Sequence, residues 1–210
     1  MKISGLYLVT PNFNKTRNFY ETIDRALSGG VDILEYNDTV NDENVKKERG
    51  LKLKKIVSKY NKPLTVYEDI NLMDEIDLDG VHFSHSDLSI DDAISFKKKY
   101  KNKVLGVSIN CDANLAIEYK KAGVDYISFG LCHKSNTNKV ANICTLEDIN
   151  TISKIDITKF AVGGMNRDNI HELSKYNFNG IVVVSAIFLS IDPKKSAGEI
   201  KKELLKRNID

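Results

Sequence analysis

Eight short apolar runs recur along this chain, and the stretches that separate them mostly show the 3.6-residue period of an amphipathic helix. The runs are rich in Val, Ile and Leu, which is typical of parallel strands that are buried on both faces. They cover residues 5–9, 32–36, 64–67, 80–83, 104–108, 126–129, 159–162 and 180–184. This alternation predicts an α/β fold with a parallel sheet.

The expected helices lie at residues 16–27, 44–60, 90–100, 113–122, 146–153, 167–176 and 191–206, with a brief helix at 69–76. Four strands follow turns that contain Gly30, Gly80, Gly123 or Gly180, and we expect these to be glycines that end the preceding helix. Eight units without a break in composition favour one closed (β/α)8 TIM barrel over an open doubly wound sheet. We therefore expect a single domain over residues 1–210.

The charge balance narrows the choice of partners. The chain has 31 basic and 29 acidic residues, a net charge of +2, so nothing indicates binding to nucleic acid or to a membrane surface. The longest apolar run, around residues 181–184, is too short to span a bilayer. Three cysteines without a Cys-x-x-Cys motif predict reduced thiols in a cytoplasmic protein, with Cys111 and Cys144 structural and Cys132 adventitious.

Two strand-to-helix turns late in the chain predict a phosphate site. Residues 160–165 (FAVGGM) and 181–186 (IVVVSA) each run from apolar residues into small ones. Glycine lets the backbone approach an anion, and free N–H groups at a helix start can bind it. In TIM barrels the last two loops commonly form such a pocket, so the ligand is expected to be a small phosphorylated molecule. The alternative is that Gly163 and Gly164 only make a tight turn.

The order and spacing of seven motifs resemble the thiamine phosphate synthase family and the related thiazole tautomerases. The motifs are residues 6–10 (LYLVT), 29–31 (GGV), 79–82 (DGVH), 106–108 (GVS), 122–130 (AGVDYISFG), 163–165 (GGM) and 184–188 (VSAIF). The resemblance covers nearly the whole chain. It implies a (β/α)8 barrel whose ligands bind at the carboxyl ends of the strands.

The resemblance also implies a reaction and its site. The synthase joins hydroxymethylpyrimidine pyrophosphate to thiazole phosphate and releases pyrophosphate, with Mg²⁺. By this likeness, Ser108 contacts pyrophosphate and the Mg²⁺ ligands are Glu68 and Asp87, although Asp87 equally fits a helix N-cap. The thiazole phosphate would be held by Gly163, Gly164, Val184 and Ser185.

The pyrophosphate half departs from the family pattern. The family's Gln-x-Arg-x-Lys is replaced by Glu35, Asn37 and Thr39, and the arginine of its Asn-Asp-Arg by Asp69. Its Thr-x-Thr-Lys loop becomes Ser135, Thr137 and Asn138, with Lys139 one place later as a substitute. Loss of cations beside a polyanion weakens both its binding and its stabilisation as a leaving group, so synthase activity is expected to be reduced.

Two other functions stay open. A thiazole tautomerase or related isomerase would use His133, His85 or Glu35 as its base, whereas a non-enzymatic paralogue would only bind a phosphorylated ligand. Glu35 and Tyr67 end strands on the catalytic face, so they are candidate substrate contacts together with Asn37. The oligomeric state is open, with a homo-oligomer among the options.

Overall fold

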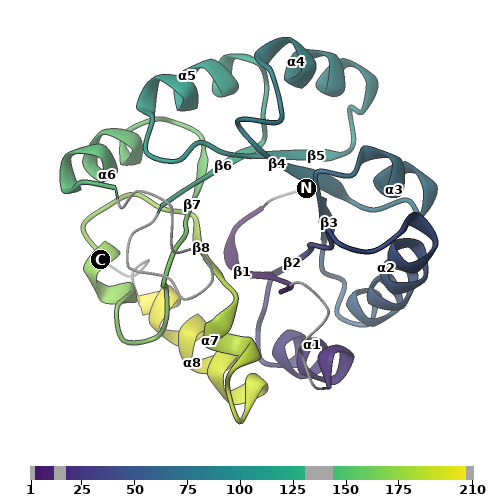
Figure 1. The fold of residues 1–210 in the computed structure, drawn as a ribbon. Helices are drawn as coiled ribbons and strands as arrows, with labels where there is room; N and C mark the ends of the chain where they lie inside the picture. Colours follow the sequence, from purple (N-terminus) through teal and green to yellow (C-terminus); the bar gives the residue numbers. More distant parts are fainter. Residues whose placement is uncertain (1–2, 12–17, 131–143, 207–210) are drawn as a thin grey trace.

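The computed structural model describes residues 3–11, 18–130 and 144–206. Its eight parallel strands close in chain order into one barrel, so the predicted (β/α)8 fold is confirmed (Figure 1). Each strand pairs with its neighbours in sequence, and β1 pairs with β8 through Gly5 and Gly180. The strands are β1 (Gly5–Val9), β2 (Ile33–Tyr36), β3 (Leu64–Tyr67), β4 (Gly80–Ser84), β5 (Val104–Ser108), β6 (Tyr126–Phe129), β7 (Thr158–Ala161) and β8 (Gly180–Val183).

The helices surround the barrel as an outer layer (Figure 1). They are α1 (Phe19–Ser28), α2 (Glu43–Ser58), α3 (Ile70–Glu75), α4 (Ile90–Lys99), α5 (Ala113–Lys121), α6 (Leu146–Ser153), α7 (Ser185–Phe188) and α8 (Pro193–Lys206). The brief helix expected at 69–76 is confirmed as α3. No helix in the described parts of the chain has the length and apolarity needed to cross a membrane.

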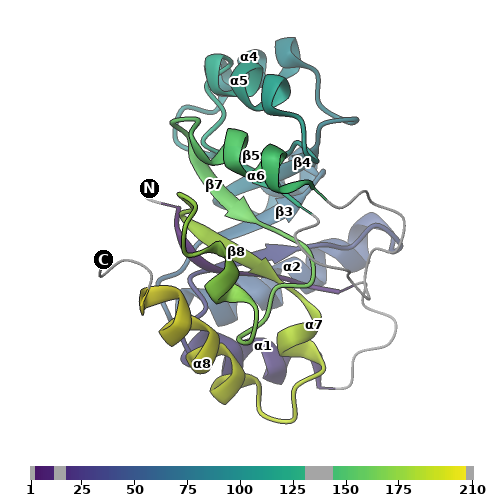
Figure 2. The same ribbon diagram turned by 90° about the vertical axis from the view of Figure 1, so that its left-hand side faces the viewer.

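The helix expected at 167–176 is wrong, because the structure has only the 3₁₀ turn η2 (Ile170–Leu173) there. Asn169 accepts a hydrogen bond from the backbone N–H of Asn166 at 2.9 Å, and Asn166 accepts one from that of Asp168 at 2.7 Å. Asparagine side chains that bond nearby backbone in this way compete with a regular helix. The short helix α7 was not predicted; it packs on α1 (Figure 2). The ring centroids of Phe19 and Phe188 are 5.7 Å apart in this contact.

The apolar side chains form two cores. The larger lies between the outer face of the barrel and the helices, which explains why the strands read as continuous apolar runs. The smaller fills the barrel interior with Ile3, Tyr7, Ile33, Val104, Tyr126, Phe160 and Val182. The barrel is therefore a packed core below its mouth.

One contact repeats four times at the amino-terminal end of the barrel. The residue just before each even-numbered strand accepts a hydrogen bond from a backbone N–H of the preceding odd-numbered strand. The pairs are Asp32 with Leu6 at 2.9 Å, Asp79 with Leu64 at 2.8 Å, Asp125 with Leu105 at 2.7 Å and Asn179 with Lys159 at 2.9 Å. This repetition is the structural basis of the recurring turn sequences.

The glycines of those turns serve two purposes rather than one. Gly30 and Gly123 have φ values of 116° and 85°, as expected for residues that end a helix. Gly80 and Gly180 instead begin strands, so their assignment as helix-ending glycines was wrong. A Cβ on Gly80 would lie 2.2 Å from the Val104 carbonyl oxygen, so the close pairing of two strands requires the glycine there.

Candidate functional site

A cavity of about 350 Å³ opens at the carboxyl ends of the strands. This is the face at which TIM barrels bind their ligands. Residues from every strand or the loop that follows it contribute to the wall: Tyr7, Val9, Glu35, Asn37, Tyr67, His82, Ser84, Ser108, Asn110, Ser128, Phe129, Gly130, Val162, Gly163, Gly164, Met165, Val182, Val183, Val184 and Ser185. The predicted contacts Glu35, Asn37, Tyr67 and Ser108 thus share one cavity with the glycine turn.

The turn after β7 presents unpaired backbone donors. Gly163 and Gly164 have φ values of 95° and 62°, and their N–H groups donate no hydrogen bond within the described part of the chain. The carbonyl oxygen of Gly164 accepts from the side-chain amides of Asn169 at 2.9 Å and Asn166 at 3.3 Å. These two asparagines fix the turn with its amides free, which suits an anion.

The second half of the predicted phosphate pocket follows β8. Val184 and Ser185 line the cavity, and α7 begins at Ser185. A short extra helix after the eighth strand is a common part of phosphate sites in this fold. The structure therefore brings both predicted turns together, and their phosphate role stays a prediction.

Glu35 is a buried carboxyl group in the cavity wall, with only 4% of its surface exposed. The Tyr7 hydroxyl donates a hydrogen bond to its Oε2 at 2.7 Å. Burial raises the pKa of Glu35 to about 7, with a further rise from the charge of Glu68, while the hydrogen bond from Tyr7 opposes it. Glu35 can therefore gain or lose a proton near neutral pH.

His82 joins this wall from β4. Its Nδ1 lies 2.9 Å from the Tyr126 hydroxyl and its Nε2 lies 2.8 Å from the Ser108 hydroxyl, which in turn lies 2.7 Å from that of Ser128. Burial lowers the pKa of His82 to about 3, so the ring is neutral. A neutral imidazole carries one N–H and one bare nitrogen, so its two contacts must have opposite hydrogen-bond directions.

Asn37 occupies the position where the family pattern has arginine. Its backbone N–H donates to the Thr10 hydroxyl at 2.9 Å, and that hydroxyl lies 3.3 Å from the Asn37 carbonyl oxygen. The side-chain Oδ1 is buried and has no hydrogen-bond partner within the described residues. A buried acceptor of this kind favours a ligand that brings a donor.

The predicted metal carboxylates, Glu68 and Asp87, do not line the cavity themselves but lie near Tyr67, which does. Glu68 has a φ of 54°, an uncommon backbone conformation, and its Oε1 accepts from the Ser84 N–H at 3.0 Å. Burial raises the pKa of Tyr67, and the carboxylates of Glu68, Glu35 and Asp87 raise it further. Glu68 and Asp87 therefore flank one tyrosine, although no cluster of three or more His, Cys, Asp or Glu suited to a metal occurs in the described chain.

Asp87 is not the cap of the next helix, which was its alternative role. The Ser89 hydroxyl accepts from the Asp92 N–H and caps α4, while Asp87 accepts from the Ser86 hydroxyl at 2.6 Å. Asp69 has a structural role: it caps α3 and lies 3.5 Å from the ammonium group of Lys46. Neither Asp87 nor Asp69 therefore brings a positive charge to an anionic ligand.

Positive charge is missing from the described wall of the cavity, which contains neither Lys nor Arg. Thr39 is exposed and does not line it. Four predicted site residues lie in the segment 131–143, outside the described residues: His133, Ser135, Thr137 and Lys139. The part of the wall that the structure describes therefore lacks the arginine and lysine side chains that the family pattern places beside the pyrophosphate.

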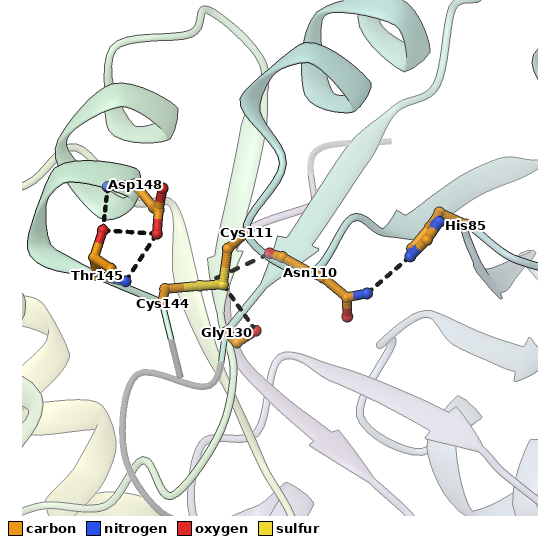
Figure 3. The surroundings of a disulfide bond; sticks show 7 residues. All are labelled: His85, Asn110, Cys111, Gly130, Cys144, Thr145 and Asp148. Carbon is orange, nitrogen blue, oxygen red and sulfur yellow. Dashed lines mark hydrogen bonds between the residues drawn. A yellow bond between two sulfur atoms is a disulfide. The ribbon is translucent and has the colours of Figure 1, made fainter. Parts of the chain in front are cut away.

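The prediction of reduced thiols is wrong, because Cys111 and Cys144 form a disulfide (Figure 3). Cys111 follows β5 and Cys144 directly precedes Thr145, the N-cap of α6, and their Cα atoms lie 5.4 Å apart. The separation of 33 residues gave no sign of this contact, which arises because the neighbouring strands β5 and β6 pair and bring the segments after them together. The bond lies next to Asn110 and Gly130, two residues of the cavity wall.

His85 was a candidate base, and the structure places it beside the cavity. Its Nε2 lies 2.8 Å from the side-chain amide of Asn110, which lines the cavity (Figure 3). This contact occupies the Nε2 atom of His85.

Sequence reasoning missed several polar residues of the site. Tyr7 and Tyr126 read as strand residues for a core, and only their alternation with outward residues could have indicated that they face the barrel interior. Asn169 lay inside the expected helix at 167–176, and Asn166 lay directly before it. Asn110 has a φ of 52°, a backbone conformation that no sequence motif around it predicts.

Comparison with known proteins agrees with this geometry. The family model described as Thiamine monophosphate synthase matches residues 6–187. A thiamine-phosphate synthase of Picrophilus torridus is 40% identical over 98% of this chain and 99% of its own, and one of Thermoplasma acidophilum is 36% identical over 97% and 93%. The solved thiamine phosphate pyrophosphorylase from Pyrococcus furiosus has a TM-score of 0.85 at 25% identity and covers 97% of this chain and 96% of its own. The chain belongs to the thiamine monophosphate synthase family.

Proposed function

We propose that this protein is a thiamine-phosphate synthase that joins hydroxymethylpyrimidine pyrophosphate to thiazole phosphate and releases pyrophosphate. The observation that carries this proposal is one cavity with unpaired amides at Gly163 and Gly164 on one side and the Ser108 hydroxyl on the other. The match to named synthases over the whole chain supports it.

The two sides of the cavity suit two different groups. The amides of Gly163 and Gly164, together with Val184 and Ser185, would hold the thiazole phosphate. Ser108 would donate to the pyrophosphate, while Glu35, Asn37 and Tyr67 would contact the pyrimidine-bearing substrate between them. Held in this way, the thiazole nitrogen and the carbon bonded to the pyrophosphate oxygen would meet inside one cavity, which favours transfer by proximity.

Mg²⁺ would suit the two carboxylates near Tyr67, Glu68 and Asp87. This ion is usually bound by one or two carboxylates together with substrate phosphates and water, and it does not need a cage of three protein ligands. Glu68 and Asp87 would hold it, since both are oxygen donors near Tyr67. When bound, Mg²⁺ neutralises charge on a leaving pyrophosphate.

The missing arginine and lysine positions predict a weaker site than the family pattern implies. Removal of one donor to a developing anion costs roughly 10²–10³ in rate. Lys139, Ser135 and Thr137 are the remaining candidates of this chain for contact with pyrophosphate. His133 was a candidate base for the isomerase alternative and has no role in the proposed transfer.

The experiment is Mg²⁺-dependent release of pyrophosphate from the two substrates. Formation of thiamine phosphate with equimolar pyrophosphate is expected, at a rate below that of synthases that keep the arginine and lysine residues of the family pattern. Thermal stabilisation by thiazole phosphate without any turnover would contradict the proposal and favour a binding paralogue.

One observation favours a second candidate, an isomerase that acts on a phosphorylated heterocycle. Glu35 has a pKa of about 7, which suits a general base near neutral pH. Exchange of ring protons of a thiazole phosphate with deuterated solvent, lost in Glu35→Gln, would support it.

The cytoplasm stays our proposed compartment, because the charge balance and small phosphorylated substrates suit it. The disulfide counts against it, since such bonds are uncommon in reducing compartments. We treat residues 1–210 as one domain and leave the oligomeric state open.

A further inference from the structure

Five side chains form a continuous hydrogen-bonded chain through the barrel interior, which we call the relay. It runs from Glu35 to Tyr7 at 2.7 Å, on to Tyr126 at 2.8 Å and then to His82 Nδ1 at 2.9 Å. The last link joins His82 Nε2 to the Ser108 hydroxyl at 2.8 Å. Both ends of the relay, Glu35 and Ser108, line the ligand cavity.

The relay has a direction when Glu35 is ionised. A carboxylate only accepts, so Tyr7 donates its single proton to Glu35. The Tyr7 oxygen then accepts from Tyr126, which leaves Tyr126 without a proton for His82. His82 must therefore carry its proton on Nδ1, and its bare Nε2 accepts from Ser108. In this state the Ser108 proton points into the relay and away from a ligand.

Protonation of Glu35 allows the opposite direction. The carboxylic acid donates to Tyr7, Tyr7 donates to Tyr126, and Tyr126 donates to His82 Nδ1. The imidazole then carries its proton on Nε2 and donates to the Ser108 oxygen. The Ser108 proton is released, and it can be donated to a ligand in the cavity or, without a ligand, to the Ser128 hydroxyl 2.7 Å away.

The interior of the barrel suits such a relay. Burial raises the pKa of both Tyr7 and Tyr126 and lowers that of His82, so all three stay neutral and pass a proton without holding a charge. Glu35 is the member that titrates near neutral pH. Gly106 leaves the space for Tyr126, because a Cβ there would lie 2.4 Å from the tyrosine hydroxyl.

Among the described residues, the groups that face Glu35 are all neutral or acidic. Tyr7 faces it from β1, Tyr67 and Glu68 from the end of β3, and Tyr126 and His82 from β6 and β4. On the other side of β2, the Asp38–Arg49 and Lys46–Asp69 pairs of the α2 layer are already matched in charge. No described cation in the cavity wall therefore competes for the role of neutralising Glu35.

We propose that an anionic ligand oxygen that accepts the Ser108 proton draws one proton from solution onto Glu35, with reversal of every hydrogen bond in the relay. One proton is taken up, His82 exchanges Nδ1–H for Nε2–H, and no member other than Glu35 changes charge. Binding of the anion thus removes one negative charge from a cavity that lacks Lys and Arg in its described wall. Glu35, Tyr7, Tyr126 and His82 are positioning residues in this scheme, which rests on the proposed anion site at Ser108.

The first test is calorimetry of inorganic pyrophosphate binding to the full-length protein at pH 8, in buffers that differ in ionisation enthalpy. Wild type is expected to take up about one proton more than Glu35→Gln. Above pH 7, the affinity of wild type for pyrophosphate, divided by that of Glu35→Gln, should fall about tenfold for each pH unit, because binding is linked to uptake of one proton. Equal proton uptake by the two proteins would overturn the relay.

The second test reads the tautomer directly and needs no variant of the relay. Nitrogen-15 spectra of the His82 ring should show Nδ1–H in the free protein at pH 8 and Nε2–H after pyrophosphate is added. His85→Gln, His133→Gln and His171→Gln, combined in one protein, leave His82 as the only signal. An unchanged tautomer in the bound state would refute the proposal.

Two matched variants separate the relay from general packing. Tyr126→Phe breaks the chain and should abolish the extra proton uptake, whereas Thr65→Val removes a hydroxyl that contacts Tyr7 at 2.9 Å outside the chain and should preserve it. Loss of uptake in both variants would contradict the proposed path. Synthase turnover is measured separately. Turnover without the extra proton uptake would contradict only the relay. Proton uptake without turnover would contradict only the proposed function.

Discussion

The Glu35 carboxyl group and the His82 imidazole are linked through only two tyrosine hydroxyls, and burial moves their pKa values in opposite directions, to about 7 and about 3. Both shifts favour the neutral form of the group. The folded state therefore binds a proton on Glu35 that the unfolded chain releases, and excludes a proton from His82 that the unfolded chain takes up.

This pair predicts an unusual pH dependence of stability. Between pH 4.5 and 7 the folded Glu35 binds more protons than the unfolded one, so its contribution to stability grows as the pH falls. Between pH 6.5 and 3 the unfolded His82 binds more protons, so its contribution shrinks as the pH falls. From pH 6.5 to 4.5 the two slopes oppose each other, and the free energy of unfolding should be nearly flat for this pair.

The variant Glu35→Gln tests the contribution of the Glu35 carboxyl group to this pH dependence. A shift from 4.5 to about 7 is 2.5 pK units, so at pH 8 the variant should gain up to about 3 kcal/mol, less whatever the altered bond to Tyr7 costs. The gain should disappear near pH 4.5, as measured by urea unfolding across pH. Glu118→Gln, on the exposed face of α5, is the control and should match wild type throughout. A gain that is the same at every pH would contradict the assignment.

Gly163→Ala and Gly164→Ala test the phosphate turn. Their φ values of 95° and 62° disfavour any side chain, so the turn should relax and its amides should leave the cavity. We expect the affinity for thiazole phosphate, measured by calorimetry, to fall at least about tenfold, which corresponds to 1.4 kcal/mol. Gly198→Ala is the matched control, because its Cβ would meet only the Gly29 carbonyl oxygen at 3.4 Å. Unchanged affinity in the first two variants would remove the pocket assignment.

The architecture could be read from the sequence because strand and helix periods are local. Six of the eight strands, among them β1 and β5, keep the predicted start, and the count of eight units without a break in composition indicated closure. The interior polar residues could not be read in this way. Tyr7 and Tyr126 are separated by 119 residues, and their hydroxyls meet only because the barrel closes. The Cys111–Cys144 bond was hidden because it depends on the pairing of β5 with β6, which no local pattern reports.

Asn37→Arg tests whether the lost cation limits the site. Asn37 lines the cavity, and arginine there would restore a charged donor where the family pattern has one. A charge-assisted hydrogen bond contributes about 1.5–3 kcal/mol, so pyrophosphate should bind at least about tenfold more tightly. Asn102→Arg, exposed just before β5 at the opposite end of the barrel, controls for net charge. Equal gains in both variants would mean that the effect is not local.

Two variants of Asp79 test the repeated contact at the amino-terminal end of the barrel. Its Oδ2 accepts from the Leu64 N–H at 2.8 Å, and loss of the acceptor in Asp79→Ala should lower stability by about 1–2 kcal/mol. The fourth copy of the contact already uses an amide, Asn179, so Asp79→Asn should retain most of the stability. Unfolding in urea measures both. Equal losses in the two variants would show that charge, rather than the acceptor, is what this position supplies.

The disulfide is tested by reduction. Cys111 and Cys144 are 33 residues apart, and a cross-link that closes a loop of this size stabilises a protein by up to about 4 kcal/mol through the entropy of the unfolded chain. Dithiothreitol should therefore lower the midpoint of thermal unfolding, and Cys111→Ser with Cys144→Ser should reproduce the loss and abolish the response. Cys132→Ser is the control and should respond to dithiothreitol as wild type does. Alkylation followed by mass spectrometry should find one free thiol in the purified protein and three after reduction. Three free thiols in protein kept under air would mean that the bond does not form, and would restore the expectation of reduced cysteines.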